Sequence, residues 1–222
     1  MDEKYFNHIS LDMQNSYYWS DDWSEEFYIV LAKAGFISTT YDTLDGLVLL
    51  PELQYDYAVL DFEDLHISQK SKKLMNKNNY ELLMNTRFNE VLEKIETQHK
   101  YNWLKNEYTQ LLKNLYVNND KHDNFKIISV ELVCKDSNEL IAGEVGYIIS
   151  NIYTSLSGFS SKYKKYKNYG TLQLVLLAQY LKERGFKFWN LGHPHMEYKQ
   201  RLGCKTLTRA DFLDKWNSAT SS

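Results

Sequence analysis

The 222-residue chain has little cysteine and little proline, with two residues of each. Cys134 and Cys204 have neither the number nor the spacing of a zinc site or a disulfide framework. No segment reaches the roughly 20 apolar residues that a membrane helix needs, and the N-terminus lacks the apolar stretch of a signal peptide. We therefore expect a protein of the reducing cytoplasm that has no contact with membranes.

The net charge of −3 hides a strong asymmetry along the chain. Residues 1–66 contain 14 Asp/Glu and 2 Lys, which gives −12, whereas residues 67–222 contain 15 Asp/Glu and 24 Lys/Arg, which gives +9. The later part can present a basic surface to a polyanion. Mutual attraction between the two parts is the alternative explanation. Apolar residues make up 43% of the chain, enough for a globular core.

Hydrophobic periodicity predicts a mixed succession of helices and strands. Helices are expected at 24–34, 68–75, 86–95, 108–115 and 171–184. Strands are expected at 47–50, 58–62, 127–134, 140–150, 151–160 and 186–191. From residue 127 onward, three antiparallel strands, a basic loop, a helix and a further strand follow one another, and this order resembles the core of GNAT-type acyltransferases. We therefore expect an α+β fold.

The basic loop at 160–170 is the first candidate binding site. It contains four lysines and no acid: Lys162, Lys164, Lys165 and Lys167. The loop leads through Gly170 into a helix, whose N-terminus offers unpaired N–H groups and a positive dipole end to phosphates. Interleaved tyrosines suit stacking on unpaired bases. An ordinary solvated loop is the alternative.

A second group of lysines lies earlier in the chain, at Lys70, Lys72 and Lys73. We assign it to the same phosphate-binding role, although a solvated helix face explains it equally well.

Polar residues after the strand that ends at Asn190 are candidates for catalysis. His193 and His195 titrate near neutrality, which suits general acid–base chemistry, and a structural Pro-containing turn is the alternative. Their spacing also suits a metal, but no third ligand is evident, so we expect none. The Asn190 amide can only orient groups or stabilise them by hydrogen bonds. Glu144 is a further candidate base if its strand faces the cleft.

Several segments together resemble the leucyl/phenylalanyl-tRNA–protein transferase family. "LDFEDLHISQKSKK" at 60–73 resembles the family's "LFPEELHISRSLRK", and "ELIAGEVGY" at 139–147 resembles "ELVGGLYGV". "SLSGFS" at 155–160 resembles "GESMFS", and "EYKQRLGCKTLTRADFL" at 197–213 resembles "HLASLGAREIPRREFL". The resembling segments follow in the family's order and cover most of residues 22–213.

The resemblance implies a small N-terminal α/β domain, residues 1–57, packed on a GNAT-type transferase domain, residues 58–222. It implies a pocket for the aminoacylated 3′ end of tRNA and no metal or CoA as cofactor. It also implies acceptors that begin with Arg or Lys, which the acidic N-terminal part would attract. We assign five residues to substrate binding: Trp103, Ser157, Phe159, Ser160 and Gly192.

Two departures from the family pattern affect the expected catalytic residues. The family's D-C-Q at the end of the catalytic strand is replaced by Asn190, Leu191 and Gly192. The glutamate of the family's "GESMFS" is replaced by Leu156. The substrate pocket and the catalytic base therefore do not transfer from the family.

We expect an aminoacyl-tRNA-dependent transferase with an altered donor or acceptor, acting as a monomer on a protein or peptide N-terminus. Asn190 would orient the reacting groups, and His193 or His195 would handle protons. One alternative is an acyl-CoA-dependent N-acyltransferase that binds pyrophosphate at the lysine loop. Another is a non-catalytic relative that binds tRNA or peptide.

Overall fold

The computed structural model describes Ile9, Asp12 and residues 14–98 and 103–220. The helices among these residues are α2 (Glu25–Lys33), α3 (Gln69–Met75), α4 (Phe88–Gln98), α5 (Asn106–Val117), α6 (Tyr169–Glu183), α7 (Glu197–Leu202) and α8 (Arg209–Thr220). The strands are β1 (Ile37–Thr43), β2 (Gly46–Glu52), β3 (Asp56–Leu60), β4 (Tyr80–Met84), β5 (Phe125–Cys134), β6 (Leu140–Ile149), β7 (Ile152–Ser160), β8 (Phe188–Asn190) and β9 (Lys205–Thr208).

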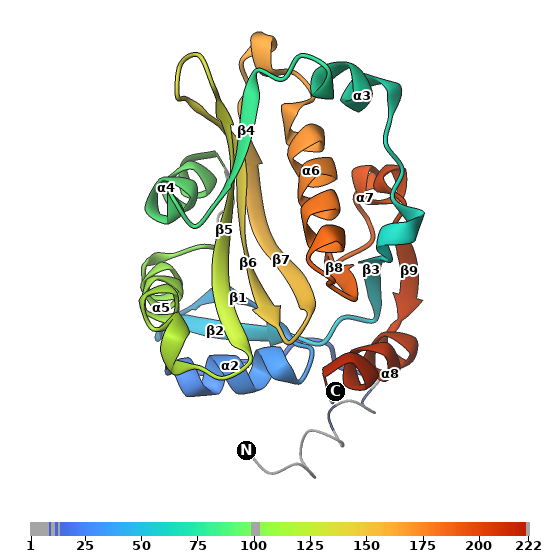
Figure 1. The fold of residues 1–222 in the computed structure, drawn as a ribbon. Helices are drawn as coiled ribbons and strands as arrows, with labels where there is room; N and C mark the ends of the chain where they lie inside the picture. The colour runs from blue at the N-terminus through green and yellow to red at the C-terminus, as the bar shows by residue number, and fades with distance from the viewer. Residues whose placement is uncertain (1–8, 10–11, 13, 99–102, 221–222) are drawn as a thin grey trace.

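A seven-stranded sheet in the order β4-β5-β6-β7-β8-β3-β9 forms the centre of the molecule. The pairing of β7 with β8 is parallel, and the other neighbouring pairs of this sheet are antiparallel. Helices α4 and α5 lie on one side of the sheet and α6 lies on the other (Figure 1). Both sides bury apolar side chains against the sheet, which gives two main core clusters.

The expected α+β fold is confirmed. Strands β5, β6 and β7, helix α6 and strand β8 follow one another in the predicted GNAT-type order. Position 57 lies within β3, and the division into domains 1–57 and 58–222 stays a prediction. Among the residues that the structure describes, none of the helices combines the length and the apolar character needed to cross a bilayer.

The shortness of β8 leaves part of β7 without a neighbour on one side. Residues 152–154 of β7 pair with 188–190 of β8, whereas residues 155–160 pair, among the described residues, only with β6. A bulge interrupts the β6–β7 ladder, because Val145 faces Ser157 while Gly146 faces Ser155. Leu156 is the extra residue, and such bulges redirect the neighbouring side chains. The sheet therefore opens beside residues 155–160.

Arg209, at the start of α8, holds the N-terminal segment against the central sheet. Its side chain is fully buried. Nε donates to the Gln54 carbonyl at 3.1 Å, and Nη2 donates to the Asn15 carbonyl at 3.1 Å and to the Leu53 carbonyl. Nη1 donates to the Asp12 carbonyl. One guanidinium therefore satisfies main-chain carbonyls from two separate segments, a task that suits its rigid fork of donors.

We expect Arg209→Leu to lower the free energy of unfolding by about 3 kcal/mol, because several buried carbonyls lose their donor. Urea unfolding of the variant beside the wild type measures this. Arg201→Leu is the matched control: Arg201 forms an exposed pair with Glu197, so its loss should change stability by about 0.5 kcal/mol or less. Equal effects of the two substitutions would contradict the role of Arg209.

Candidate active site

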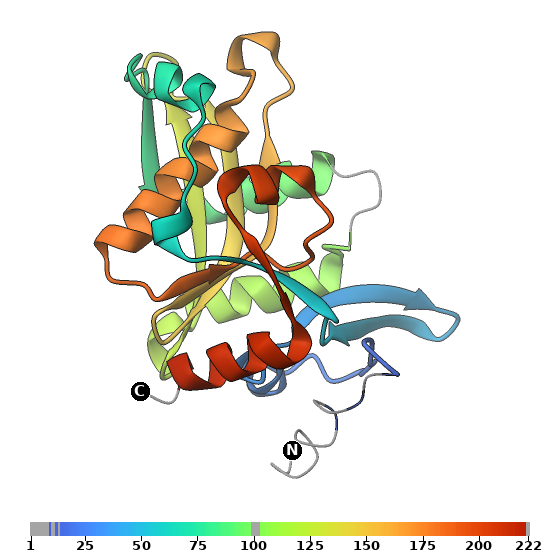
Figure 2. The ribbon, with the colours of Figure 1, turned by 90° about the vertical axis from the view of Figure 1, so that its right-hand side faces the viewer.

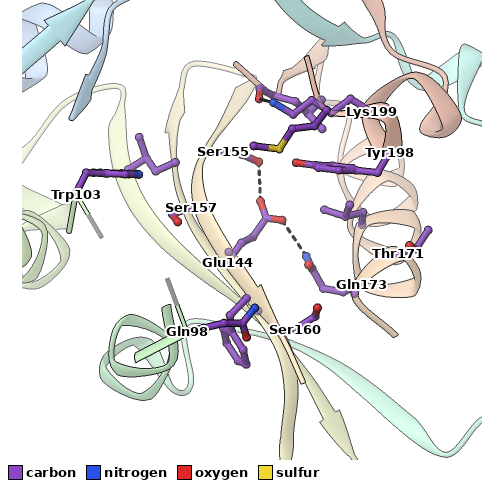
Figure 3. A pocket seen from close by; sticks show the side chains of 18 residues that line it. Gln98, Trp103, Glu144, Ser155, Ser157, Ser160, Thr171, Gln173, Tyr198 and Lys199 are labelled. Carbon is purple, nitrogen blue, oxygen red and sulfur yellow. Dashed lines mark hydrogen bonds between the residues drawn. The ribbon is translucent and has the colours of Figure 1, made fainter. Parts of the chain in front are cut away.

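A cavity of about 500 Å³ opens beside residues 155–160 of β7, on the side where they have no neighbouring strand among the described residues, between β6, α6 and α7 (Figure 3). Its polar lining includes Gln98, Glu144, Ser155, Ser157, Ser160, Thr171, Gln173, Tyr198 and Lys199. Its apolar lining consists of Trp103, Leu156, Phe159, Leu174, Leu191 and Met196. The cavity therefore combines hydrogen-bonding groups with apolar walls, as small-molecule sites commonly do.

Glu144, on β6, forms part of the cavity wall and is buried. Its Oε1 accepts hydrogen bonds from the Tyr153 hydroxyl at 2.8 Å and the Ser155 hydroxyl at 2.7 Å. Its Oε2 accepts one from the Gln173 amide at 3.1 Å, and Figure 3 shows the carboxylate between Ser155 and Gln173. Burial raises the pKa of the Glu144 carboxyl, while the three donors act against that rise. Glu144 lines the cavity, which is the condition set for its candidacy, and its role as a base stays a prediction.

Lys199, on α7, is a residue that the sequence analysis did not single out. It is buried, and its Nζ donates to the carbonyls of Leu191 and His193, both at 2.5 Å. Burial lowers the pKa of Lys199 to about 8, although the nearby Cys204 and Glu144 raise it. A lysine inside the polar stretch "EYKQRL" is expected to be exposed to solvent, so the sequence does not indicate that Lys199 is buried.

Asn190 lies inside the sheet and outside the lining of the cavity. Its Oδ1 accepts a hydrogen bond from the Gly192 amide at 3.0 Å, and its Nδ2 donates to the Thr154 hydroxyl at 3.4 Å. Gly192 is also absent from the described lining; its φ of +70° allows the chain to turn after β8. The Asn190 amide therefore fixes this turn. The roles predicted for Asn190 and Gly192 in the reaction stay predictions.

The two candidate histidines also lie outside the described lining of the cavity. His193 Nε2 is 2.9 Å from Oε2 of Glu52, a buried carboxylate on β2. His195 is exposed, and its ring stacks on that of His193 with centroids 5.7 Å apart. No three His, Cys, Asp or Glu side chains of the described residues are arranged to hold a metal ion. Proton handling by these histidines stays a prediction.

Four of the five predicted substrate-binding residues do line the cavity: Trp103, Ser157, Phe159 and Ser160. Trp103 packs edge-on against the Tyr108 ring, with centroids 5.2 Å apart, which fixes its orientation at one side of the opening. The structure therefore brings these residues together with Glu144.

The lysine loop borders a second hollow, of about 520 Å³, that adjoins the cavity. Both hollows share three lining residues: Ser160, Gly170 and Thr171. Lys162, Lys164 and Lys167 line the second hollow, and none of them forms an ion pair with another described residue. Lys165 is instead paired with Glu139 at 3.2 Å and lies over the Tyr166 ring. Lys162, Lys164 and Lys167 therefore line a hollow that adjoins the cavity.

The second lysine group lies at the same end of the molecule as the loop. Lys70, Lys72 and Lys73 are exposed on α3, which packs against α6. Figures 1 and 2 both show α3 and the loop before α6 at the top of the molecule. The two basic segments therefore form one positively charged end.

We expect Glu144→Gln to gain stability relative to the wild type as pH rises above about 4, the ordinary range of a glutamate pKa. The folded protein holds the Glu144 proton above the ordinary pKa, so the wild type loses stability as that proton dissociates. Unfolding free energies at several pH values measure this difference.

Glu139→Gln is the matched control with the opposite sign. A hydrogen bond from Tyr166, with help from Lys165, lowers the pKa of Glu139, so its charge stabilises the fold once pH exceeds the unfolded pKa. This variant should lose stability relative to the wild type as pH rises. Parallel pH curves for the two variants would contradict the assignment of Glu144.

The family model described as leucyl/phenylalanyl-tRNA protein transferase matches residues 59–217 of this chain. A protein of that name from Flavobacterium psychrophilum is 29% identical over 160 residues, which cover 70% of this chain and 69% of the relative. Its namesake from Flavobacterium johnsoniae is 26% identical over 159 residues, with 70% and 69% covered. Among solved structures, FemX shares the fold with a TM-score of 0.51 at 9% identity, over 69% of this chain and 60% of FemX. Because the family model matches well over half of its residues, this chain belongs to the leucyl/phenylalanyl-tRNA protein transferase family.

Proposed function

We propose that the protein transfers an aminoacyl group from tRNA to the N-terminal amine of a protein or peptide. The observation that carries the proposal is the junction of the two hollows at Ser160, Gly170 and Thr171. A lysine-lined entrance for phosphates there opens beside a cavity large enough for an aminoacyl ester. Family membership supplies the reaction type.

The entrance suits a single-stranded RNA end. Lys162, Lys164 and Lys167 would neutralise phosphates, and the amides of the first turn of α6 would add donors. Tyr163 is 66% exposed in the same loop and offers a ring for base stacking. The 3′ end would then pass Gly170 and place its ester within reach of Ser157 and Ser160.

The reaction itself is a transfer between an activated ester and an amine. The amine nitrogen attacks the ester carbonyl, a C–N bond forms, the C–O bond to the ribose breaks, and one proton moves from nitrogen to the ribose oxygen. Holding both reactants in place contributes up to about 7–11 kcal/mol in well-oriented cases. The hydroxyls of Ser157 and Ser160 are available donors for the transient oxyanion.

The acceptor amine would approach from the side of Trp103. The Thr40 hydroxyl of β1 donates to the Trp103 carbonyl, so the acidic N-terminal part lies next to the cavity. Its carboxylates would attract acceptors that begin with Arg or Lys. Charged tRNA is a cytoplasmic substrate, and one chain contains the whole proposed site, so we propose a cytoplasmic monomer.

A transfer assay tests the proposal. The protein is incubated with total charged tRNA and with peptides that begin with Arg, Lys or Ala, and mass spectrometry records any added residue. We expect one class of amino acid to appear on the peptide N-terminus. Acylation that requires acyl-CoA instead would favour the N-acyltransferase alternative, and tRNA binding without any transfer would favour a non-catalytic relative.

We expect the triple substitution of Lys162, Lys164 and Lys167 by glutamine to lower the affinity for tRNA. The same substitution should also make that affinity less dependent on salt concentration. Each lost phosphate contact should make the slope of log affinity against log salt shallower by about 0.7–0.9, or about 2–3 for all three. Filter binding at several salt concentrations measures this slope.

The matched control replaces three lysines at the opposite end of the sheet: Lys113, Lys121 and Lys126. They lie on α5 and around the start of β5, far from the loop in Figures 1 and 2. Both triple variants change the net charge equally, so an equal loss of slope would show attraction by overall charge and contradict a site at the loop.

A further inference from the structure

Lys199 lies in the wall of the cavity with its ammonium group buried. We propose that Lys199 accepts the proton of the attacking amine and returns it to the departing ribose oxygen. This inference rests on the proposed aminoacyl transfer, and it gives a chemical role to a residue outside the predicted catalytic set.

The hydrogen bonds of Lys199 suit both of its protonation states. A neutral amine has two N–H groups and one lone pair, and the carbonyls of Leu191 and His193 accept two hydrogen bonds from Nζ at 2.5 Å each. The remaining tetrahedral position holds either the lone pair or the third proton. Lys199 lines the cavity, and in the proposed step this remaining position is directed toward a reactant there.

The groups around Lys199 keep its two states close in free energy. Cys204, in the segment after α7, and Glu144, on β6, favour the ammonium form, whereas burial disfavours it more strongly. Tyr198, on its own helix, places its ring centroid 5.9 Å from Nζ. With a pKa of about 8, about one-tenth of Lys199 is neutral at pH 7. A group with a pKa near the working pH is well suited to move a proton in both directions.

In the proposed step, Lys199 accepts one proton and donates it again, so the protons balance. The amine nitrogen forms its bond to the ester carbon, and its extra proton moves to the Lys199 lone pair. The C–O bond to the ribose then breaks, and the Lys199 ammonium donates that proton to the ribose oxygen. Lys199 ends neutral, as it began, and no further reactant is consumed.

The other titratable groups nearby are less well placed for this step. The His193 ring is bound to Glu52, and His195 is exposed, so neither ring faces the cavity. The Glu144 carboxylate faces the cavity but already accepts three hydrogen bonds. Lys199 is therefore the lining residue that combines a free position on nitrogen with two populated charge states.

The test compares the pH dependence of transfer in the wild type and in Lys199→Arg. A weakly basic acceptor amine, already deprotonated at neutral pH, removes the acceptor's own titration from the profile. For the wild type, the single-turnover rate should rise tenfold per pH unit and level off near pH 8. Arginine can still donate to both carbonyls but does not deprotonate in this range, so the rate should fall about 100-fold or more and lose its rising limb.

The control variant is Lys182→Arg, the same substitution at an exposed lysine of α6 that pairs with Glu63. It should retain the rate and the pH profile of the wild type. tRNA affinity should be unchanged in Lys199→Arg, which separates a proton-transfer defect from a binding defect.

A second variant tests the inference even if arginine disturbs the segment between β8 and α7, whose carbonyls accept the hydrogen bonds of Lys199. Lys199→Cys, alkylated with bromoethylamine, contains γ-thialysine, a less basic lysine, and should shift the rising limb to lower pH. Wild type treated in parallel controls for modification of Cys134 and Cys204.

An unshifted rising limb in the alkylated variant, or a Lys199→Arg enzyme with the wild-type pH profile, would show that Lys199 only supports the segment between β8 and α7. Absence of transfer by the wild type itself would overturn the proposed function and this inference together.

Discussion

The candidate site depends on the short pairing between strands β7 and β8. Strands β7 and β8 run side by side for three residues, and then the two chains separate. Three features of the candidate site accompany that separation: the one-sided edge of residues 155–160, the cavity beside it, and the position of α7 in the cavity wall. A longer β8 would extend the ladder along this edge and fill the cavity with sheet.

The strong periodicity of the chain made its main elements predictable. The strands now labelled β5, β6 and β7 and the helix α6 are long and apolar, so local pattern outweighs other signals there. Serines of β7, Trp103 and Glu144 were predicted near the site because they lie on those elements or match the family. Short or polar elements such as β4, β9 and α7 have weaker periodicity, and the sequence did not predict them.

The remaining site residues depend on partners that are distant in sequence. The His193 ring contacts the carboxylate of Glu52, which is 141 positions away in the sequence. Nothing in the local sequence "GHPHM" indicates that contact. Lys199 is buried, and two carbonyls of the preceding loop accept hydrogen bonds from its Nζ. Such burial arises from tertiary packing, so a polar local sequence conceals it. Electrostatic roles were therefore harder to predict than backbone structure.

The position of the lysine entrance outside the cavity, although the two adjoin, has a consequence for turnover. Phosphates bound at Lys162, Lys164 and Lys167 would be the same before and after the aminoacyl group leaves. Under the proposed function, the entrance would hold discharged tRNA as firmly as its charged precursor, and only contacts inside the cavity would distinguish the two. Discharged tRNA would then compete with charged tRNA, so the proportion of tRNA that is charged in the cell would regulate the rate of the proposed transfer.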